Sequence, residues 1–295
     1  MANAVIEIEN LTKYYGSSIG VQNLNFSVSE GEIFGFLGPN GAGKTTTIRL
    51  LLNLLYPTSG TAKIFDLDCV KDSLKVREEL GYLAGDPNLY PTLSGKTFLD
   101  FIDSFRPEKK SKYRRELTTR LNLDAKRKIK QYSRGNLQKL GIIQALMHKP
   151  KLAILDEPSS GLDPLVQLEF YKILEELKKE GKTIFLSSHN LSEVEKICDR
   201  VAIIRQGKIV AVESIEKIRH RSIRVAEVFF KAEFKKEDFK FDNVKIIETG
   251  EHYLKLQLPS SMINQVLAKL AKYEVHDLSF TTPDLEEIFL QYYEK

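Results

Sequence analysis

The stretch GPNGAGKT, residues 38–45, constrains the fold more than any other feature of the sequence. It matches the pattern G-x-x-x-x-G-K-[ST] without a gap, follows the apolar run EIFGFLG and precedes the apolar segment Ile48 to Leu55. A buried strand, a glycine-rich loop and a helix, in this order, are the context in which the pattern forms a phosphate-binding loop. The chain is therefore expected to place this loop at the carboxyl end of a strand in a largely parallel sheet.

The loop residues have predicted contacts with a nucleotide. The glycines let backbone N–H groups surround phosphate oxygens, because no Cβ stands in the way. Lys44 is expected to reach the β- and γ-phosphates, Thr45 to offer its hydroxyl to Mg²⁺, and Thr46 to reach the α-phosphate. The candidate nucleotide-binding residues of the loop are Gly38, Pro39, Asn40, Gly41, Ala42, Gly43, Lys44, Thr45 and Thr46. A glycine-rich turn with an incidental lysine is the alternative, and the context of the motif argues against it.

A second apolar run, KLAILDE, ends in the two carboxylates Asp156 and Glu157. Its apolar residues predict a buried strand whose carboxyl end lies beside the phosphate loop. Asp156 is expected to hold Mg²⁺ together with Thr45. Glu157 could polarise a water in line with the γ-phosphate, which makes it the candidate catalytic carboxylate. A plain surface carboxylate is the alternative for Glu157, and the neighbouring Asp156 argues against it.

Strand and helix patterns alternate through residues 1–220, which we expect to form one α/β domain with a mainly parallel sheet. Strands are predicted over 5–11, 24–28, 32–38, 61–69, 151–157 and 183–189, and a hairpin over 201–214 that turns at Gln206–Gly207. Between about 86 and 150 helical patterns replace the strands, so this block is an inserted helical subdomain. Residues 106–134 carry twelve Lys or Arg against three Asp or Glu. A solvated helical face is the favoured interpretation; a surface facing anionic lipid or a partner's cytoplasmic loop is the alternative.

Residues 222–295 form a separate pattern of strands and helices, which predicts a small α+β accessory domain. The final helix is expected to begin at Thr282–Pro283, a threonine cap followed by proline at the first helical position. This domain contains no recognisable site chemistry. It could dimerise, bind a regulator or brace the first domain.

The bulk composition limits the class of protein. Hydrophobic residues make up 42% and charged residues 28% of the 295 residues, which is ordinary for a globular chain. The two cysteines, Cys69 and Cys198, are far apart in sequence and suggest a reducing compartment. The sequence opens without a basic and then apolar leader, and its apolar runs are shorter than a membrane span. We therefore expect a cytoplasmic protein, and a net charge of +4 does not argue for nucleic acid as a partner.

Taken together, residues 4 to about 220 resemble the nucleotide-binding subunit of ATP-binding cassette (ABC) transporters. YSRGNLQKL resembles the family signature Leu-Ser-Gly-Gly-Gln, with Ser133 and Gly135 matching it. SSGLD resembles the D-loop and ends at Asp163, and His189 follows a strand as the family's switch histidine does. Tyr15 in LTKYYG stands where an aromatic residue stacks on adenine. The resemblance implies a phosphate-loop ATPase fold with an antiparallel N-terminal β part.

The resemblance also implies a mechanism. Two subunits would join head to tail around two ATP molecules, each ATP held by the phosphate loop of one subunit and by Ser133 and Gly135 of the other. Glu157 would act on the water, and His189 would contact the γ-phosphate. Loss of that phosphate would open the dimer and drive integral-membrane permease subunits. The protein would then lie at the inner face of the cell membrane, bound through the permease.

Two positions depart from the family pattern. Gly85 stands where a Gln or Glu is usual at the hinge into the helical subdomain, so either coupling tolerates the loss or Asp86 substitutes for it. Arg134 replaces the first glycine of the signature; its side chain either points to solvent or brings a cation near a partner's γ-phosphate. A basic residue here and the closing stretch TTPDLEEIFLQYYEK resemble exporter cassettes with separate permease chains, which favours export.

Two other functions compete with a transporter ATPase. A soluble cassette ATPase acting on nucleic acid or ribosomes would usually carry two cassettes, long heptad repeats or zinc modules, whereas this sequence has one phosphate loop. A regulatory module that barely hydrolyses ATP would explain Gly85, although Glu157 and His189 argue against it. A GTPase would need a guanine-reading Asn-Lys-x-Asp, which is absent from the sequence.

Overall fold

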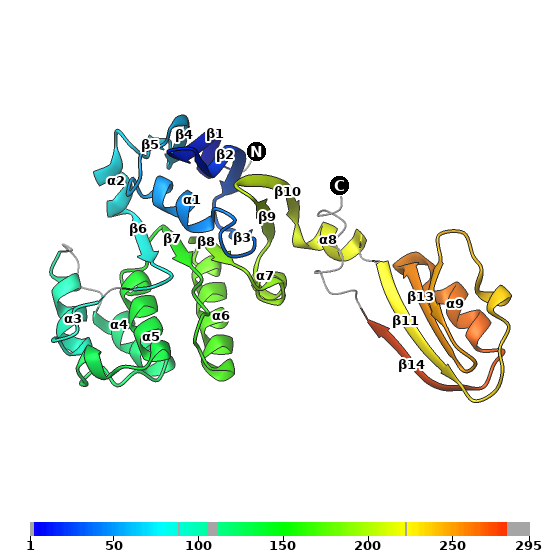
Figure 1. Cartoon of the computed structure of the whole chain (residues 1–295). Coiled ribbons are helices and arrows are strands. Elements are labelled where there is room, and N and C mark those ends of the chain that lie inside the picture. The colour runs from blue at the N-terminus through cyan, green and yellow to red at the C-terminus, as the bar shows by residue number, and fades with distance from the viewer. Residues whose placement is uncertain (1–2, 88, 106–110, 222, 282–295) are drawn as a thin grey trace. The chain divides into compact units, whose positions relative to one another are not determined.

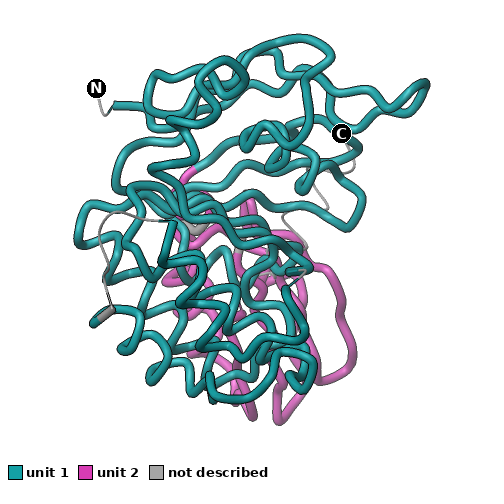
Figure 2. Tube along the Cα trace, turned by 90° about the vertical axis from the view of Figure 1, so that its left-hand side faces the viewer, with its two compact units in different colours: residues 1–213 teal, residues 214–295 magenta. Residues whose placement is uncertain are grey.

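The computed structural model describes residues 3–87, 89–105, 111–221 and 223–281 (Figure 1). The chain forms two compact units, Met1–Glu213 and Ser214–Lys295, coloured separately in Figure 2. The division falls a few residues before the boundary of about 220 expected from the sequence. The helix predicted from Thr282 lies outside the described residues. None of the described helices combines the length and the apolar character needed to cross a membrane.

The first unit is built on a six-stranded sheet in the order β10-β9-β3-β8-β7-β6. Its strands are β3 (Ile33–Leu37), β6 (Leu80–Leu83), β7 (Leu152–Asp156), β8 (Thr183–Ser188), β9 (Arg200–Arg205) and β10 (Lys208–Ser214). Strands β9, β3, β8, β7 and β6 pair in parallel. Every residue of β3, β7 and β8 is buried, as expected for a parallel sheet covered on both faces. The predicted α/β class is therefore confirmed, and β6 is an element that the sequence patterns did not predict.

The register of the parallel strands gathers three loops at one edge of this sheet. Leu37, the last residue of β3, is paired with Ser188, the last residue of β8. Asp156, the last residue of β7, is paired with Ser187 of β8. The phosphate loop, Glu157 and His189 therefore leave the sheet side by side.

A second sheet, in the order β2-β1-β4-β5, covers the N-terminal part of the unit. It consists of β1 (Ala4–Tyr15), β2 (Ser18–Ser29), β4 (Ser59–Ile64) and β5 (Leu67–Asp68), all paired antiparallel. The single strand predicted over 61–69 is wrong, because two strands of a hairpin occupy this stretch. Phe65 and Asp66 form its turn with φ values of 53° and 62°, which interrupt extended backbone.

Helices cover the sheets and form the inserted block. Helices of the first unit are α1 (Lys44–Leu51), α2 (Ser73–Glu78), α3 (Gly95–Asp103), α4 (Ser111–Arg120), α5 (Arg134–Leu146), α6 (Pro164–Lys179) and α7 (Leu191–Ile197). Helices α3, α4 and α5 gather beyond the β6 edge of the sheet (Figure 1). Arg120 of α4 donates to Glu169 at 2.6 Å and to Glu176 at 2.9 Å, both on α6. These charge-assisted bonds tie the helical block to a helix of the main sheet.

The second unit has its own sheet, in the order β12-β13-β11-β14, and its own core. Its elements are α8 (Ile215–Arg221), β11 (Ile223–Phe230), β12 (Lys245–Thr249), β13 (Tyr253–Pro259), α9 (Ile263–Leu270) and β14 (Val275–Thr281). Leu254, Leu256 and Leu258 alternate along β13 and are all fully buried. The order of strands is that of a split β-α-β fold in which a short 3-10 turn, Lys236–Phe239, replaces the first helix.

Candidate functional site

The phosphate loop has a backbone that requires glycine at two positions. Gly43 has φ 113°, and a Cβ built there would lie 2.7 Å from Val21 Cγ1. A Cβ on Gly38 would lie 2.3 Å from the carbonyl oxygen of Ile204. A side chain is therefore excluded at both positions: at Gly43 by the positive φ, and at Gly38 by the neighbouring carbonyl oxygen. The loop packs tightly against β9 and β2, which fixes the start of α1.

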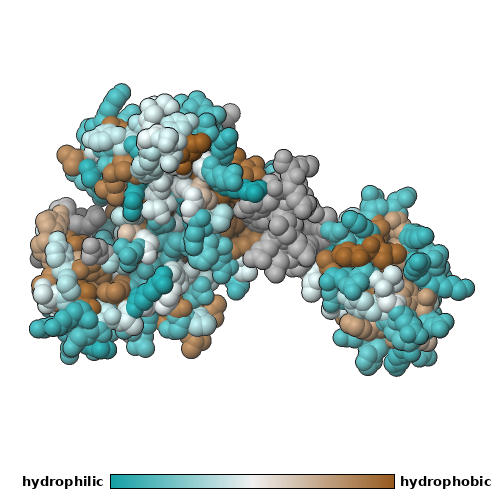
Figure 3. All heavy atoms as spheres, viewed as in Figure 1, coloured by the Kyte–Doolittle hydropathy of each residue, from teal (hydrophilic) through white to brown (hydrophobic). Residues whose placement is uncertain are grey.

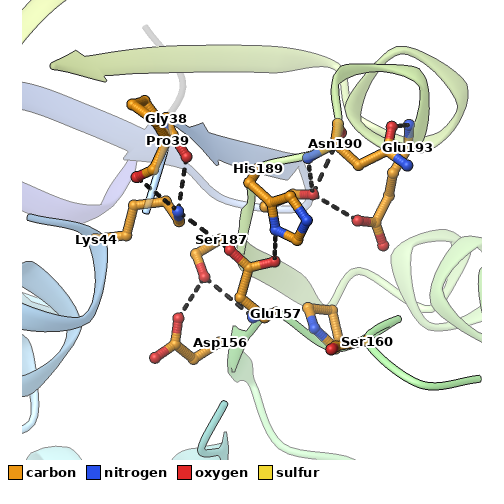
Figure 4. A network of polar contacts seen from close by, with 12 residues as sticks. Gly38, Pro39, Lys44, Asp156, Glu157, Ser160, Ser187, His189, Asn190 and Glu193 are labelled. Atoms are coloured by element: carbon orange, nitrogen blue, oxygen red, sulfur yellow. Dashed lines mark hydrogen bonds and ion pairs between the residues drawn. The ribbon is translucent and has the colours of Figure 1, made fainter. Parts of the chain in front are cut away.

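Lys44 bridges the loop and the candidate catalytic carboxylate. Its Nζ donates to the carbonyl oxygens of Gly38 at 2.7 Å and Pro39 at 3.2 Å, and forms an ion pair with Glu157 Oε1 at 3.1 Å (Figure 4). The side chain is 6% exposed. A buried ammonium needs an anionic partner, and Glu157 supplies it in this structure. The buried ammonium of Lys44 therefore marks a position in the site where an anionic group binds.

Asp156 and Thr45 form a compact set of oxygen atoms. Thr45 Oγ1 donates to Asp156 Oδ2 at 2.8 Å. Ser187 Oγ donates to Asp156 Oδ1 at 2.5 Å, as Figure 4 shows. Asp156 is 2% exposed. A hydroxyl and a carboxylate are the ligand types that Mg²⁺ prefers, so these two residues fit the ion assigned to them from the sequence.

Glu157 contacts both candidate catalytic partners. Its Oε2 lies 2.7 Å from His189 Nδ1, while its Oε1 pairs with Lys44 (Figure 4). His189 follows β8 and is half exposed. Of the three residues predicted to be catalytic, Glu157 therefore contacts both Lys44 and His189 at the end of the sheet.

A pocket lies over the phosphate loop. Its wall is formed by Tyr15, Ile19, Gly20, Asn40, Gly41, Gly43, Lys44, Thr45, Thr46 and Glu157. The Tyr15 hydroxyl is 3.4 Å from Thr46 Oγ1, and its ring, 46% exposed, lies against Gly20. An exposed aromatic ring beside a phosphate loop suits stacking on a planar base. Tyr15, rather than Tyr14, lines this pocket.

The signature residues lie elsewhere. Ser133 and Gly135 are not among the described residues that line the pocket over the phosphate loop. Ser133 is exposed and caps α5, its Oγ accepting from the backbone N–H of Asn136 at 3.3 Å. Asp163 likewise caps α6, with Oδ1 accepting from the N–H of Val166 at 3.0 Å. The structure therefore separates these three predicted nucleotide contacts from the chain's own pocket.

Arg134, the unusual signature residue, contacts the D-loop of its own chain. Its Nη2 donates to Ser160 Oγ at 2.9 Å, and its stem lies over Gly161. The side chain thus has a defined partner, and the alternative of a side chain simply pointing to solvent is wrong.

Gly85 faces the candidate metal ligands. A Cβ on Gly85 would lie 3.4 Å from Asp156 Oδ2, so a longer side chain here would reach the Thr45–Asp156 pair. Asp86 and Arg49 line the same pocket as Gly85. The pocket at Gly85 is therefore lined by three carboxylates, those of Asp86, Asp156 and Glu157, and by two cations, those of Arg49 and Arg134.

Glu193 is a buried carboxyl group behind the site. It lies on α7, is 2% exposed, and accepts from Ser188 Oγ at 2.6 Å. Burial raises its pKa above the ordinary value. The folded state therefore holds the proton of Glu193 more tightly than the unfolded chain, and stability is lost as pH rises through the interval between the two pKa values.

The loss of stability with rising pH gives a testable prediction for Glu193→Gln, whose side chain cannot ionise. The melting temperature of the variant should rise relative to wild type as pH increases from about 4, near the pKa of an unfolded glutamate, toward neutrality. Thermal unfolding of both proteins at a series of pH values measures this. A difference that stays constant with pH would contradict a raised pKa at Glu193.

Sequence reasoning missed two residues that support the site. Ser187 receives the N–H of Glu157 and donates to Asp156, and its only sequence signal is its place two residues before His189. Gln138 donates Nε2 to the carbonyl oxygens of Glu157 and Pro158. Gln138 lies within the stretch YSRGNLQKL, but it bonds to backbone atoms, so nothing in the residues that matched the signature marked it as part of the site.

Comparisons with known proteins identify the family of the chain. Residues 21–160 match the family model described as ABC transporter. The chain is 39% identical over 228 residues to the bacitracin transport ATP-binding protein BcrA of Bacillus licheniformis, covering 76% of this chain and 74% of that protein. It is 34% identical over 297 residues to the uncharacterized ABC transporter ATP-binding protein YhcH of Bacillus subtilis, covering 97% and 95%.

A solved structure gives the same result for the fold. The ATP-binding subunit of an ABC transporter superposes with a TM-score of 0.69 at 28% identity, over 73% of this chain and 92% of that one. The chain therefore belongs to the ABC transporter ATP-binding proteins, the ATPase subunits whose ATP hydrolysis is coupled to transport.

Proposed function

We propose that this subunit dimerises head to tail around two ATP molecules and powers a membrane exporter. One observation carries the proposal: Ser133 and Gly135 do not line the described pocket over the phosphate loop, although Arg134 between them lines an adjoining pocket with Thr45 and Glu157. Lys44, Thr45 and Glu157 line one pocket, whereas Ser133 and Gly135 stand at the exposed start of α5. A helix start with an exposed hydroxyl and no acidic residue in its first turn suits a phosphate. A second copy would supply that phosphate.

The position of each residue in the proposed site supports a specific role in binding or hydrolysis. Thr45 and Asp156 would hold Mg²⁺, which when bound neutralises phosphate charge. Lys44 is placed to exchange the carboxylate of Glu157 for phosphate oxygens. Glu157, released from Lys44, could accept a proton from a water, and His189 is close enough to orient that carboxylate. Tyr15 would stack on the base, and Asp163 would lie at the junction of the two subunits.

The permease partner is supported by an exposed aromatic cluster on the helical block. Phe101 of α3 is 43% exposed and Phe105, two residues after the helix ends, is 70% exposed; Tyr90 packs edge-on against Phe101. Hydrophobic side chains gather over α3 in Figure 3. A patch of this kind marks an interaction surface. We propose that it receives a cytoplasmic segment of the permease, which would hold the subunit at the inner face of the membrane.

Export is proposed because of the relatives' stated activities. BcrA of Bacillus licheniformis is named for bacitracin transport. Arg134 at the signature and the closing stretch TTPDLEEIFLQYYEK also resemble exporter cassettes. Reconstitution with the permease in vesicles tests direction: ATP added on the side of this subunit should move the substrate to the opposite side.

Dimerisation is tested with Glu157→Gln, which should bind ATP without consuming it. Light scattering should report a monomer without nucleotide and a dimer of this variant with ATP. A variant that stays monomeric with saturating ATP would contradict the shared-site proposal. The same experiment with Lys44→Ala is the control, because this variant lacks the phosphate-binding cation and should not dimerise.

A regulatory module with little hydrolysis is the second candidate function, and Gly85 is the observation that favours it. The transport ATPase and the regulatory module can be distinguished at Asp86, if its carboxylate substitutes for the Gln or Glu that is usual at position 85. Asp86→Ala should then lower Mg²⁺-dependent ATPase activity by about tenfold, with the exposed Asp66→Ala as the control. Full activity of Asp86→Ala would remove Asp86 from the mechanism. Equal activity of wild type and Glu157→Gln would favour the regulatory module.

A further inference from the structure

The backbone of Glu157 has an unusual conformation that its surroundings must impose. Its φ is 49°, in the left-handed region that costs a side-chain-bearing residue free energy. From the sheet side, its N–H donates to Ser187, whose carbonyl oxygen lies 3.2 Å and whose Oγ lies 3.1 Å from the nitrogen. The conformation aims the Glu157 side chain between Lys44 and His189, so the carboxylate depends on whatever holds this peptide.

Gln138 of α5 holds the other side of the same residue. Its Nε2 donates to the carbonyl oxygen of Glu157 at 3.1 Å and to that of Pro158 at 3.0 Å. Gln138 is only 3% exposed. Both N–H bonds of this buried amide are directed at two successive carbonyl groups. Removing the donors would take the amide from the buried carbonyl oxygen of Pro158 and leave that of Glu157 with the N–H of Ser160 at 3.2 Å alone, which would loosen the turn that follows β7.

Further contacts join the first turns of α5 to the same loop. Arg134 donates to Ser160 at 2.9 Å, and Lys139 lies 4.0 Å from the carboxylate of Asp163. A Cβ on Gly135 would lie 2.6 Å from the carbonyl oxygen of Gly161. The loop of residues 157–163 therefore rests along the start of α5, and a shift of the helix would be passed to it.

We propose that Gln138 is a positioning residue for hydrolysis, which fixes the Glu157 peptide and transmits the position of α5 to the catalytic carboxylate. The inference rests on the proposed function, because only in a shared site does the start of α5 meet the partner's ATP. Contact of Ser133 and Gly135 with that ATP would shift the start of α5. Gln138, about one turn further along the same helix, would pass this shift through its hydrogen bonds to Glu157 of the same chain. Each half of the dimer would thus prepare its own site when it binds the other's nucleotide.

The test is Gln138→Met, which has a similar length and no donor. Its kcat for ATP should fall about tenfold to a hundredfold, as expected when a reacting group is displaced by about 1 Å. The KM for ATP should stay within about twofold, because Lys44 and the phosphate loop are unchanged. The Hill coefficient for ATP should fall toward 1 relative to wild type, which a merely structural role would not produce. Gln144→Met, at a half-buried position further along α5, is the matched control and should behave as wild type.

A second pair of variants makes the outcome decisive. Gln138→Glu has the same shape and loses the amide donors, so it should reproduce the loss of kcat and carries the test if Gln138→Met melts below the assay temperature. Gln138→Lys restores a donor and should recover part of the activity. If wild type hydrolyses ATP and the Met and Glu variants keep its kcat and Hill coefficient, this inference is overturned while the proposed function stands. If Glu157→Gln shows no ATP-driven dimer, the proposed function fails first, and the inference with it.

Discussion

Glu157→Gln is expected to lower the rate of ATP hydrolysis by about a hundredfold or more, while ATP still binds. The amide has the shape of the carboxylate but cannot accept a proton from water. It also removes the negative partner of Lys44, whose Nζ lies 3.1 Å from Oε1 in this structure. Binding of ATP should therefore be as tight as in wild type or tighter, since the phosphate no longer competes with Glu157 for the ammonium.

Steady-state phosphate release and the binding of a fluorescent ATP analogue measure the two halves of this prediction. Glu175→Gln is the matched control, because Glu175 is an exposed glutamate on α6. It should leave hydrolysis and binding unchanged. Glu157→Gln with more than about a tenth of wild-type activity would show that another group activates the water.

Ser133→Arg is expected to abolish hydrolysis while sparing the binding of ATP to the monomer. Ser133 is exposed at the cap of α5 and does not line the pocket formed by Lys44 and Tyr15 among the described residues. A long side chain there would leave the chain's own phosphate loop untouched. It would fill the place of a partner's phosphate and remove the hydroxyl that caps the helix.

Light scattering with ATP and steady-state hydrolysis measure the effect of Ser133→Arg. ATP-driven dimerisation and hydrolysis should both disappear, and the affinity of the monomer for ATP should stay near that of wild type. Ser279→Arg, at an exposed serine of the second unit, controls for the added charge. Hydrolysis that survives in Ser133→Arg would mean that the signature does not complete the site.

The sequence predicted the parts of the fold that depend on local pattern. GPNGAGKT between two apolar runs predicted the strand, loop and helix, and KLAILDE predicted a fully buried strand. Strand β6 was not predicted because its four residues adjoin a long helical block and show no alternation of apolar and polar residues. The hairpin of β4 and β5 was not predicted because Phe65 and Asp66 form its turn, at positions where Asn or Gly is usual.

The contacts of the site were harder to predict than its members. A motif can specify that Lys44, Asp156 and Glu157 belong together, because strand order brings them to one edge. It cannot specify that Lys44 pairs with Glu157, since that depends on the register of β3, β8 and β7. Arg134 was ambiguous for the same reason: its partner, Ser160, lies 26 residues away on another loop.

The shared site is tested most directly by mixing two inactive variants, Lys44→Ala and Ser133→Arg. In a mixed dimer, the intact phosphate loop of the Ser133→Arg chain would face the intact signature of the Lys44→Ala chain, so one complete site forms. Half of randomly assorted dimers are mixed and each holds one complete site, so recovery in an equimolar mixture is limited to about a quarter of wild-type ATPase activity. The complete site uses Glu157 of the Ser133→Arg chain, whose own signature is disabled, so the loss of coupling through Gln138 should lower the recovered activity about tenfold further. A mixture no more active than the two variants alone would contradict a site built from two chains.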